Sequence, residues 1–397
     1  MSSGQNIHEN DRRTFFMSNL YIPFHYDYVG SFLRPENLKK ARRQFDEGKI
    51  TYAQLKEVED QAITDLIKKI KSLGYHVITD GEFRRATWHL DFMWGLDGVG
   101  HVPTKTGLPF HGEAAMIDDT YLVGKIGLSK EHPFVEHFRF VKQFEDENTV
   151  AKQTLPAPAQ VLAQFTMPFN REATEKYYDN DAELIDDLVA AYKKVIDDLY
   201  EAGCRNVQLD DCTWGMLADK TAPFSYGTTV EGLKEIQQTY KDINNRVIAN
   251  APEGVTVATH VCRGNFHSTY ASSGAYDAVA EVLFGEENAA GYYLEFDDER
   301  SGGFAPLAKV SGNKKIVLGL VTTKSSVLES KKAIIERIHE AEKYVPLDRL
   351  YLSPQCGFAS CEIGNKLTEE QQWAKLKLVK EIAEEVWERK GKSSLLV

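Results

Sequence analysis

The chain has 397 residues, is 42% hydrophobic and carries a formal net charge of -12 at pH 7. This apolar content is enough for a large core, whereas an acidic chain without a Lys/Arg block is poorly suited to nucleic acid or an anionic membrane surface. We therefore expect small-molecule substrates and exclude nucleic-acid and membrane partners, while composition leaves a homo-oligomer open.

The first residues are predicted to be a flexible tail. Residues 1–16 are polar and aperiodic, and they lack the apolar segment of a secretory signal. No run of about 18 apolar residues follows them. We expect a single domain over 17–397 in the cytoplasm, where thiols stay reduced. The five cysteines show no disulfide-framework spacing and are Cys204, Cys212, Cys262, Cys356 and Cys361.

Short β-rich runs then alternate with long helical patterns. A helix is predicted over 52–73, because Thr51 and Gln54 match a capping box and Gly74 supplies a stop. A strand over 76–82 follows it directly.

The same order recurs to the end of the chain. A second long helix over 182–202 stops at Gly203, and an amphipathic segment over 368–389 comes last. The strand candidates are 25–31, 76–82, 150–156, 206–211, 255–262, 291–296, 315–321 and 349–354.

Eight strand candidates, most of them followed by a helix, predict a (β/α)8 TIM barrel. A doubly wound sheet is the alternative, but neither a GxGxxG motif nor a P-loop supports a nucleotide site in it. One long stretch, 83–149, interrupts the alternation after the second strand. We expect it to form a strand-rich insertion over the mouth of the barrel.

Polar residues at the strand ends suggest a metal site, because all strands of such a barrel end on one face. His260 and Cys262 are two residues apart at one strand end, so both side chains point the same way. Glu295 ends the next strand, and Cys356 follows the last one. Together they offer the nitrogen, sulfur and oxygen donors of a tetrahedral zinc site. Alone, the His-x-Cys pair is more typical of a buried thiol beside a hydrogen-bonded imidazole, and only convergence on one face of a barrel makes the metal site an equal alternative.

Other strand ends favour an amino-acid substrate. Glu82 and Asp210 are carboxylates suited to an ammonium group, while Gly30 and Ser31 offer backbone N–H groups and a hydroxyl to a carboxylate. Carboxylates at strand ends also serve simply as caps for the next helix.

The remaining cysteines are predicted to be structural. Cys204 lies in a helix-to-strand turn and Cys361 in a loop. Cys212 directly follows the strand candidate 206–211, so a position near the site stays open for it, although packing is the favoured role.

At this point the sequence resembles the cobalamin-independent methionine synthase family, specifically its C-terminal catalytic barrel. The resemblance extends from about Tyr21 to Lys390, and the chain is similar to the short, single-barrel relatives. The motifs that carry it are VGSFLRP, ITDGEFRR, VQLDD, THVCRGN, YYLEFDDERSG and LYLSPQCGF.

The resemblance implies methyl transfer from a methyltetrahydrofolate-type donor to the homocysteine thiolate, which makes methionine. The zinc (Zn2+) ligands that it implies are His260, Cys262, Glu295 and Cys356. The homocysteine contacts that it implies are Gly30, Ser31, Glu82 and Asp210.

The chain departs from the family pattern on the donor side. Full-length enzymes carry a histidine in an Asp-x-His-Ser motif after the seventh strand, whereas this chain has Lys324 there, within LVTTKSS. Departure of the donor nitrogen requires a proton, so Lys324 is the candidate general acid, with a solvated lysine that opens a loop as the equally open alternative. A tryptophan expected to stack on the donor is replaced near Gln164.

Two other functions are compatible with parts of the pattern. The first is a zinc-dependent thiol alkyltransferase of the epoxyalkane:coenzyme M transferase type, although Glu82 and Asp210 would repel a sulfonate. The second is a metal-free, decarboxylase-like barrel or a non-catalytic binding protein, in which the cysteines only pack. Metal analysis separates the second from the zinc enzymes.

Overall fold

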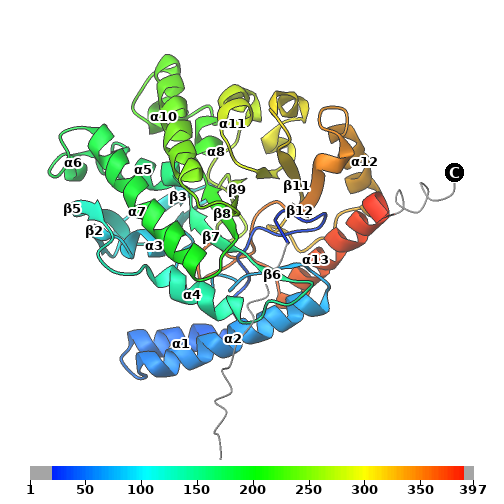
Figure 1. Ribbon diagram of the computed structural model, residues 1–397, viewed down its shortest axis with the longest axis horizontal. Coiled ribbons are helices and arrows are strands. Elements are labelled where there is room, and N and C mark those ends of the chain that lie inside the picture. Colours follow the sequence, from blue (N-terminus) through cyan, green and yellow to red (C-terminus); the bar gives the residue numbers. More distant parts are fainter. Residues whose placement is uncertain (1–19, 389–397) are drawn as a thin grey trace, which may run out of the picture.

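The computed structural model describes residues 20–388. The tail expected over 1–16 and the last residue of the helix expected over 368–389 lie outside the described residues. Within them, helices surround a central ring of extended segments (Figure 1).

Parallel pairing runs around the ring in the order β7, β8, β9, β10, β11, β12. β6 continues into β7 and pairs with β1. Tyr26 bridges Leu352 of β12, and the Phe32 amide donates to the Gly81 carbonyl at 3.1 Å, so the first extended segment contacts both neighbours. This closed ring confirms the predicted (β/α)8 barrel. The ring strands are β1 (Val77–Ile78), β6 (Val150–Ala151), β7 (Gln153–Pro156), β8 (Asn206–Asp211), β9 (Thr256–Val261), β10 (Gly291–Glu295), β11 (Lys315–Val321) and β12 (Leu350–Pro354).

The first two ring segments are less regular than predicted. The candidate 25–31 forms a single bridge, and β1 covers only two residues of the candidate 76–82. Side-chain hydrogen bonds replace ladder bonds there, since the Thr79 hydroxyl donates to the Gly30 carbonyl at 3.0 Å and accepts from the Gly81 amide at 3.1 Å.

The helices begin and end close to the predicted positions. Thr51 and Gln54 form both halves of the capping box of α2, and Gly74 and Gly203 follow the ends of α2 and α7 with positive φ. The helices are α1 (Glu36–Asp46), α2 (Tyr52–Ser72), α3 (Leu90–Trp94), α4 (Pro133–Lys142), α5 (Pro158–Thr166), α6 (Arg171–Thr174), α7 (Asp181–Glu201), α8 (Thr213–Leu217), α9 (Ala222–Ser225), α10 (Val230–Ala249), α11 (Ala280–Glu286), α12 (Lys331–Ala341) and α13 (Glu369–Ala383).

The insertion between β1 and β6 contains two antiparallel strand pairs. The outer pair is β2 (Asp97–Val102) with β5 (Asp119–Gly127), and the inner hairpin is β3 (Leu108–Phe110) with β4 (Glu113–Ala115). His111, at the hairpin tip, donates its amide to the Tyr270 carbonyl at 2.8 Å, and Glu113 pairs with His267 at 2.7 Å. The hairpin is therefore fixed to the loop after β9, on the face where the strands end.

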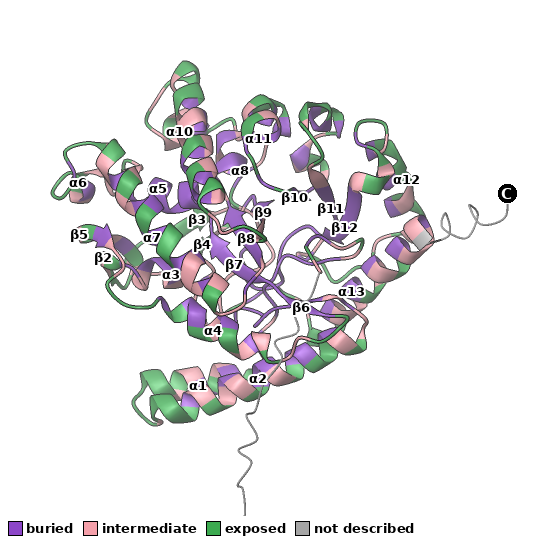
Figure 2. Cartoon of the chain, viewed as in Figure 1, coloured by how far each residue is buried: buried purple, intermediate pink, exposed green. Residues whose placement is uncertain are grey.

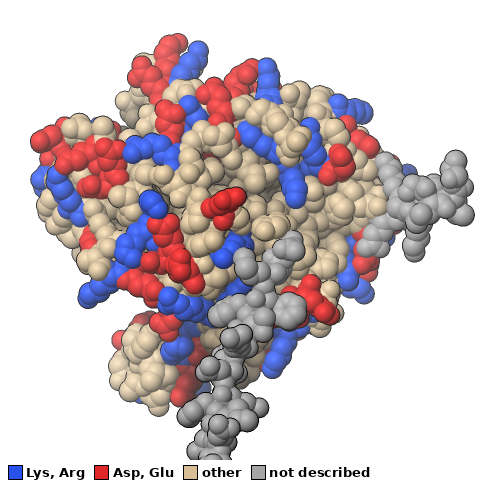
Figure 3. All heavy atoms as spheres, viewed as in Figure 1, with Lys and Arg blue, Asp and Glu red and all other residues tan. Residues whose placement is uncertain are grey.

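Burial follows the barrel geometry. The ring strands are buried, whereas the surrounding helices expose their outer faces (Figure 2). Acidic and basic side chains are interspersed over the face drawn in Figure 3. Of the helices in the described part of the chain, none is both long and apolar enough to span a bilayer.

Candidate active site

Four side chains with metal-binding atoms meet where strands end. His260 belongs to β9 and Cys262 follows it, Glu295 ends β10, and Cys356 lies just after β12. Their ligand atoms all lie within 4.8 Å of one another, and the sulfur atoms of Cys262 and Cys356 are 3.7 Å apart. All four side chains are buried. The fold therefore brings together the four residues that the sequence analysis combined.

Neighbouring backbone groups orient this cluster. The His260 Nδ1 faces the Tyr293 carbonyl at 3.1 Å and must donate to it, which leaves the Nε2 lone pair free. Glu295 accepts the Arg263 amide at 3.0 Å with one oxygen. Among the described residues, His260 Nε2 and Glu295 Oε2 find no hydrogen-bond partner, and Arg300 approaches Glu295 only to 3.6 Å. Two buried polar atoms aimed at a common centre fit a metal ion.

The electrostatics of the cluster also fit a cation. Hydrogen bonds from Cys212 and Cys356 hold the pKa of the Cys262 thiol well below its usual range. Burial, and next the Cys262 thiolate, raise the pKa of Glu295 to about 8. Thiolate and carboxylate thus oppose each other at close range, and a central divalent cation would stabilise both anions.

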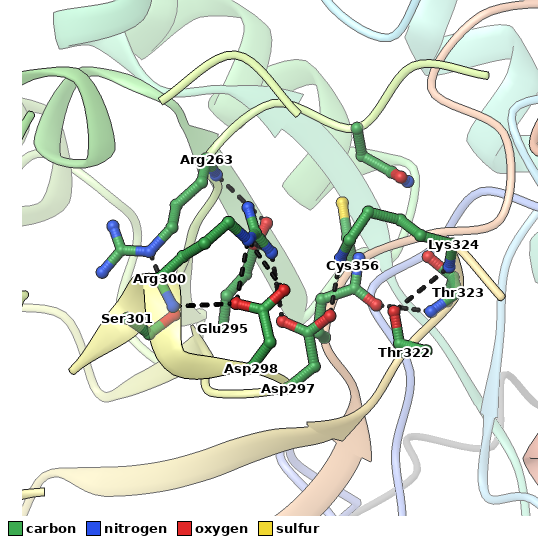
Figure 4. Close-up of polar contacts among 12 residues, drawn as sticks. Arg263, Glu295, Asp297, Asp298, Arg300, Ser301, Thr322, Thr323, Lys324 and Cys356 are labelled. Carbon is green, nitrogen blue, oxygen red and sulfur yellow. Dashed lines mark hydrogen bonds and ion pairs between the residues drawn. The ribbon is translucent and has the colours of Figure 1, made fainter. Parts of the chain in front are cut away.

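Lys324 belongs to an ionic network that borders the cluster, because Arg300 lies near both Glu295 and Asp297. Its Nζ is 2.6 Å from Asp297, which also pairs with Arg300 at 3.3 Å (Figure 4). Although burial opposes ionisation, Lys324 and Arg300 hold the pKa of Asp297 below its usual range. The side chain of Lys324 thus points toward Asp297. Lys324 does not line the cavity that adjoins the cluster, which is described next.

A cavity of about 350 Å³ adjoins the cluster and is lined mainly by apolar groups. His260, Cys262 and Cys356 form part of its wall. Leu108 and Phe110, on strand β3 of the inserted β3–β4 hairpin, form another part of the wall. A volume of this size accommodates a small-molecule substrate.

Two predicted substrate contacts, Glu82 and Asp210, line this cavity and are almost fully buried. Glu82 accepts from the Thr154 hydroxyl at 3.1 Å and from Arg85 at 3.2 Å with Oε1, while its Oε2 has no partner among the described residues. Asp210 accepts from Gln208 at 2.7 Å. Burial is the largest cause of the raised pKa of both groups, which for Asp210 reaches about 7. Both carboxyls would therefore gain from a bound cation.

Ser31 and Gly30 have different positions relative to the cavity. Ser31 lines it, and the Ser31 hydroxyl lies 3.4 Å from the Ala359 amide. Gly30 does not line it and has a positive φ of 157°. A Cβ on Gly30 would come within 2.8 Å of Thr154 Cγ2, so this position requires glycine for packing.

Several cavity residues were not predicted from the sequence. Cys361 was expected to be structural but lines the cavity, as do Cys212, His89 and Asp219. His89 is buried, its Nδ1 lacks a partner among the described residues, and burial lowers its pKa to about 3. Of these residues, only Cys212 carried a usable sequence signal, because it follows the strand end at Asp211.

Known proteins are similar to this chain over most of its length. The catalytic-domain model of the cobalamin-independent synthases matches residues 26–385. Bacillus subtilis (strain 168) YxjG is 45% identical over 371 residues, which are 92% of this chain and 95% of YxjG. The methionine synthase of Pyrococcus horikoshii is 24% identical, with 83% of this chain and 84% of that protein covered.

A solved structure from Listeria monocytogenes, provisionally named a vitamin-B12-independent methionine synthase, is 38% identical. It covers 93% of this chain and 99% of its own, with a TM-score of 0.73. The barrel fold, the match to the family model and the similarity to the Listeria monocytogenes structure all indicate the same family. The chain belongs to the cobalamin-independent methionine synthase family, whose members are methyltransferases.

Proposed function

We propose that the chain is a zinc-dependent methyltransferase that moves a methyl group from a methyltetrahydrofolate-type donor to the thiol of homocysteine, which makes methionine. The observation that carries this proposal is the convergence of His260, Cys262, Glu295 and Cys356 beside a cavity lined by two buried carboxyls. The names of the relatives from Pyrococcus horikoshii and Listeria monocytogenes support the same reaction.

The donor set fits zinc in composition and spacing. One imidazole, two thiolates and one carboxylate are typical zinc ligands, and sulfurs bound tetrahedrally at about 2.3 Å would be about 3.8 Å apart. The observed sulfur separation is 3.7 Å. A bound zinc ion supplies Lewis acidity, which keeps a substrate thiol in its nucleophilic thiolate form at neutral pH.

The chain's own residues bind and orient the acceptor. Glu82 and Asp210 offer carboxylates to the ammonium group of homocysteine, and Glu82 Oε2 is free to accept from it. Ser31, with the backbone at Gly30, is proposed to receive the substrate carboxylate. The apolar wall excludes water and strengthens these charged contacts.

The leaving nitrogen of an N-methyl donor must receive a proton. Lys324 is the proposed proton donor, because it occupies the position of the histidine found in full-length relatives. It is paired with Asp297 and only 11% exposed, so its side chain would have to leave Asp297 to reach the donor.

The test uses the full chain loaded with zinc. The purified chain should retain about one zinc ion. Incubation with homocysteine and methyltetrahydrofolate should form methionine, which is detected by mass spectrometry. Chelation should abolish turnover, and added zinc should restore it. A chain that retains no zinc, or that alkylates a sulfonate thiol and leaves homocysteine unmodified, would contradict the proposal.

A further inference from the structure

The cavity wall has an uneven distribution of charge. Within residues 20–388, the wall carries the carboxyl groups of Glu82, Asp210 and Asp219, and its only Lys or Arg side chain is Arg263. Hydrogen bonds from the Thr221 and Ser273 backbones hold the pKa of Asp219 below its usual range despite partial burial. Because Glu82 and Asp210 are proposed to bind the ammonium group of homocysteine, Asp219 is the carboxylate of the wall that remains for a second ligand.

The cationic side chains near the cavity make other contacts. The Arg263 guanidinium is buried, lies over the Tyr276 ring at 4.2 Å, and donates its Nε–H to Ser301 at 3.1 Å, while its two terminal nitrogens have no hydrogen-bond partner among the described residues. Lys324 pairs with Asp297 outside the wall. Among the described residues the wall therefore carries no ammonium group, and its one guanidinium already lies over Tyr276 and donates to Ser301.

This arrangement favours a donor that needs no proton. When a methyl group leaves a neutral tertiary amine, the nitrogen takes the bonding pair and must be protonated. In a methylsulfonium the bonding pair goes to an already positive sulfur, which leaves as a neutral thioether. The acceptor thiolate forms the new S–CH3 bond, so the overall reaction converts a sulfonium and a thiol into a thioether, methionine and a proton.

The aromatic and methionine side chains of the wall also suit a small cation. The rings of Trp88, Phe110 and Phe169 line the cavity together with Met167 and Met216. Aromatic faces attract sulfonium and quaternary ammonium groups through their quadrupole, and this attraction adds to that of nearby carboxylates. An anionic donor tail would gain from neither.

We propose that this cavity also accepts an aliphatic methylsulfonium as methyl donor, recognised by the Asp219 carboxylate and the aromatic wall. The inference rests on the proposed function for its acceptor, homocysteine, and adds a donor class that does not require Lys324.

The first experiment compares donors on the zinc-loaded chain with homocysteine. The probes are trimethylsulfonium, S-methylmethionine and methyltetrahydrofolate, each supplied with homocysteine that is deuterated in its carbon chain. Methionine that carries the homocysteine label, formed from S-methylmethionine or from trimethylsulfonium, supports the inference. Methionine from methyltetrahydrofolate alone overturns it and leaves the proposed function intact. No methionine from any donor overturns both.

The second experiment measures cation recognition without turnover of the probe. Choline and its neutral carbon isostere, 3,3-dimethylbutan-1-ol, are compared as competitive inhibitors of the donor. Choline should bind at least about tenfold more tightly because only its head group is charged. Equal inhibition by the two compounds overturns the inference.

A variant pair locates the effect. Asp219→Asn should weaken inhibition by choline about fivefold to tenfold and leave that by the neutral isostere unchanged. Asp277→Asn is the control, because Asp277 is exposed and does not line the cavity. An unchanged choline constant in folded Asp219→Asn contradicts the role of Asp219. If that variant fails to fold, the isostere comparison on the wild-type chain still decides.

Discussion

Glu82 is the residue at which the proposed recognition of the substrate ammonium group can be tested most directly, because one of its carboxylate oxygens has no partner among the described residues. It is 3% exposed, and its Oε1 is already engaged by Thr154 and Arg85, whereas Oε2 is without a partner. Glu82→Gln keeps the size of the side chain and an acceptor oxygen for Thr154, but removes the negative charge. The backbone at this position has a φ of 60°, a strained conformation that the substitution leaves in place.

The magnitude follows from the contact that is lost. A hydrogen bond to a charged group contributes about 1.5 to 3 kcal/mol, which corresponds to a roughly 10- to 150-fold change in affinity. Asp210 remains as a second carboxyl, so some homocysteine binding should persist. Because the ammonium group is held equally in the ground state and the transition state, the loss should appear as a higher KM with kcat nearly unchanged.

The assay is steady-state methionine formation at varied homocysteine, with zinc content measured on the same preparation. Glu136→Gln is the matched control, because Glu136 is exposed on α4 and should leave both constants unaltered. A wild-type KM for homocysteine in folded Glu82→Gln would refute the assignment of Glu82 to the ammonium group. If the Glu82→Gln chain also lost zinc, the result would indicate a structural role for Glu82.

Three further predictions address the metal, the proton and stability. Cys356→Ala should weaken zinc binding by about 100-fold or more in a chelator competition, and retention at wild-type affinity would exclude it as a ligand. Lys324→Met should lower turnover with methyltetrahydrofolate about 100-fold at unchanged zinc content, whereas an unaltered kcat eliminates its proposed acid role. Burial raises the pKa of Glu287 to about 8 in the folded chain, whereas the pKa of an ordinary Glu in the unfolded chain is about 4.3. The wild-type chain therefore loses stability as the pH rises from about 4.3 through 8, because the unfolded chain ionises first. A glutamine at this position does not titrate. Glu287→Gln should therefore be more stable than wild type by about 1 to 3 kcal/mol at pH 9, with the difference vanishing near pH 4 in thermal unfolding; a difference that is independent of pH contradicts this.

The convergence of the four candidate metal ligands was predictable because strand ends are fixed by the barrel. His260 and Asp210 are register partners on β9 and β8, and Glu295 ends the next strand. Parallel strands place such residues at one height on one face, so one-dimensional spacing translates directly into proximity. Cys356 followed from the same rule, since it comes just after the last strand.

The irregular parts could not be predicted because side chains distant in sequence determine them. The first ring segment forms a single ladder bridge because groups such as Thr79 take over its hydrogen bonds. The pairing of Lys324 with Asp297 joins two different loops, and no local pattern encodes it. The helix α4 was hidden in the insertion, where no strand-to-helix alternation marks it.

The difference between the regular strands and the irregular loops also separates the methyl-acceptor side of the proposed site from its methyl-donor side. The acceptor side depends on residues such as His260, Asp210 and Glu295, which belong to buried strands held on both edges by neighbours. The donor side depends on the β3–β4 hairpin, whose sheet has only two strands and which is fixed by loop contacts such as Glu113 with His267. Substitutions in the hairpin can therefore reshape the donor wall while the strand ends keep the cluster intact. Replacing Phe110 by leucine should thus alter the ranking of methyl donors without changing zinc affinity, and a loss of zinc in that variant would show that the two halves are not independent.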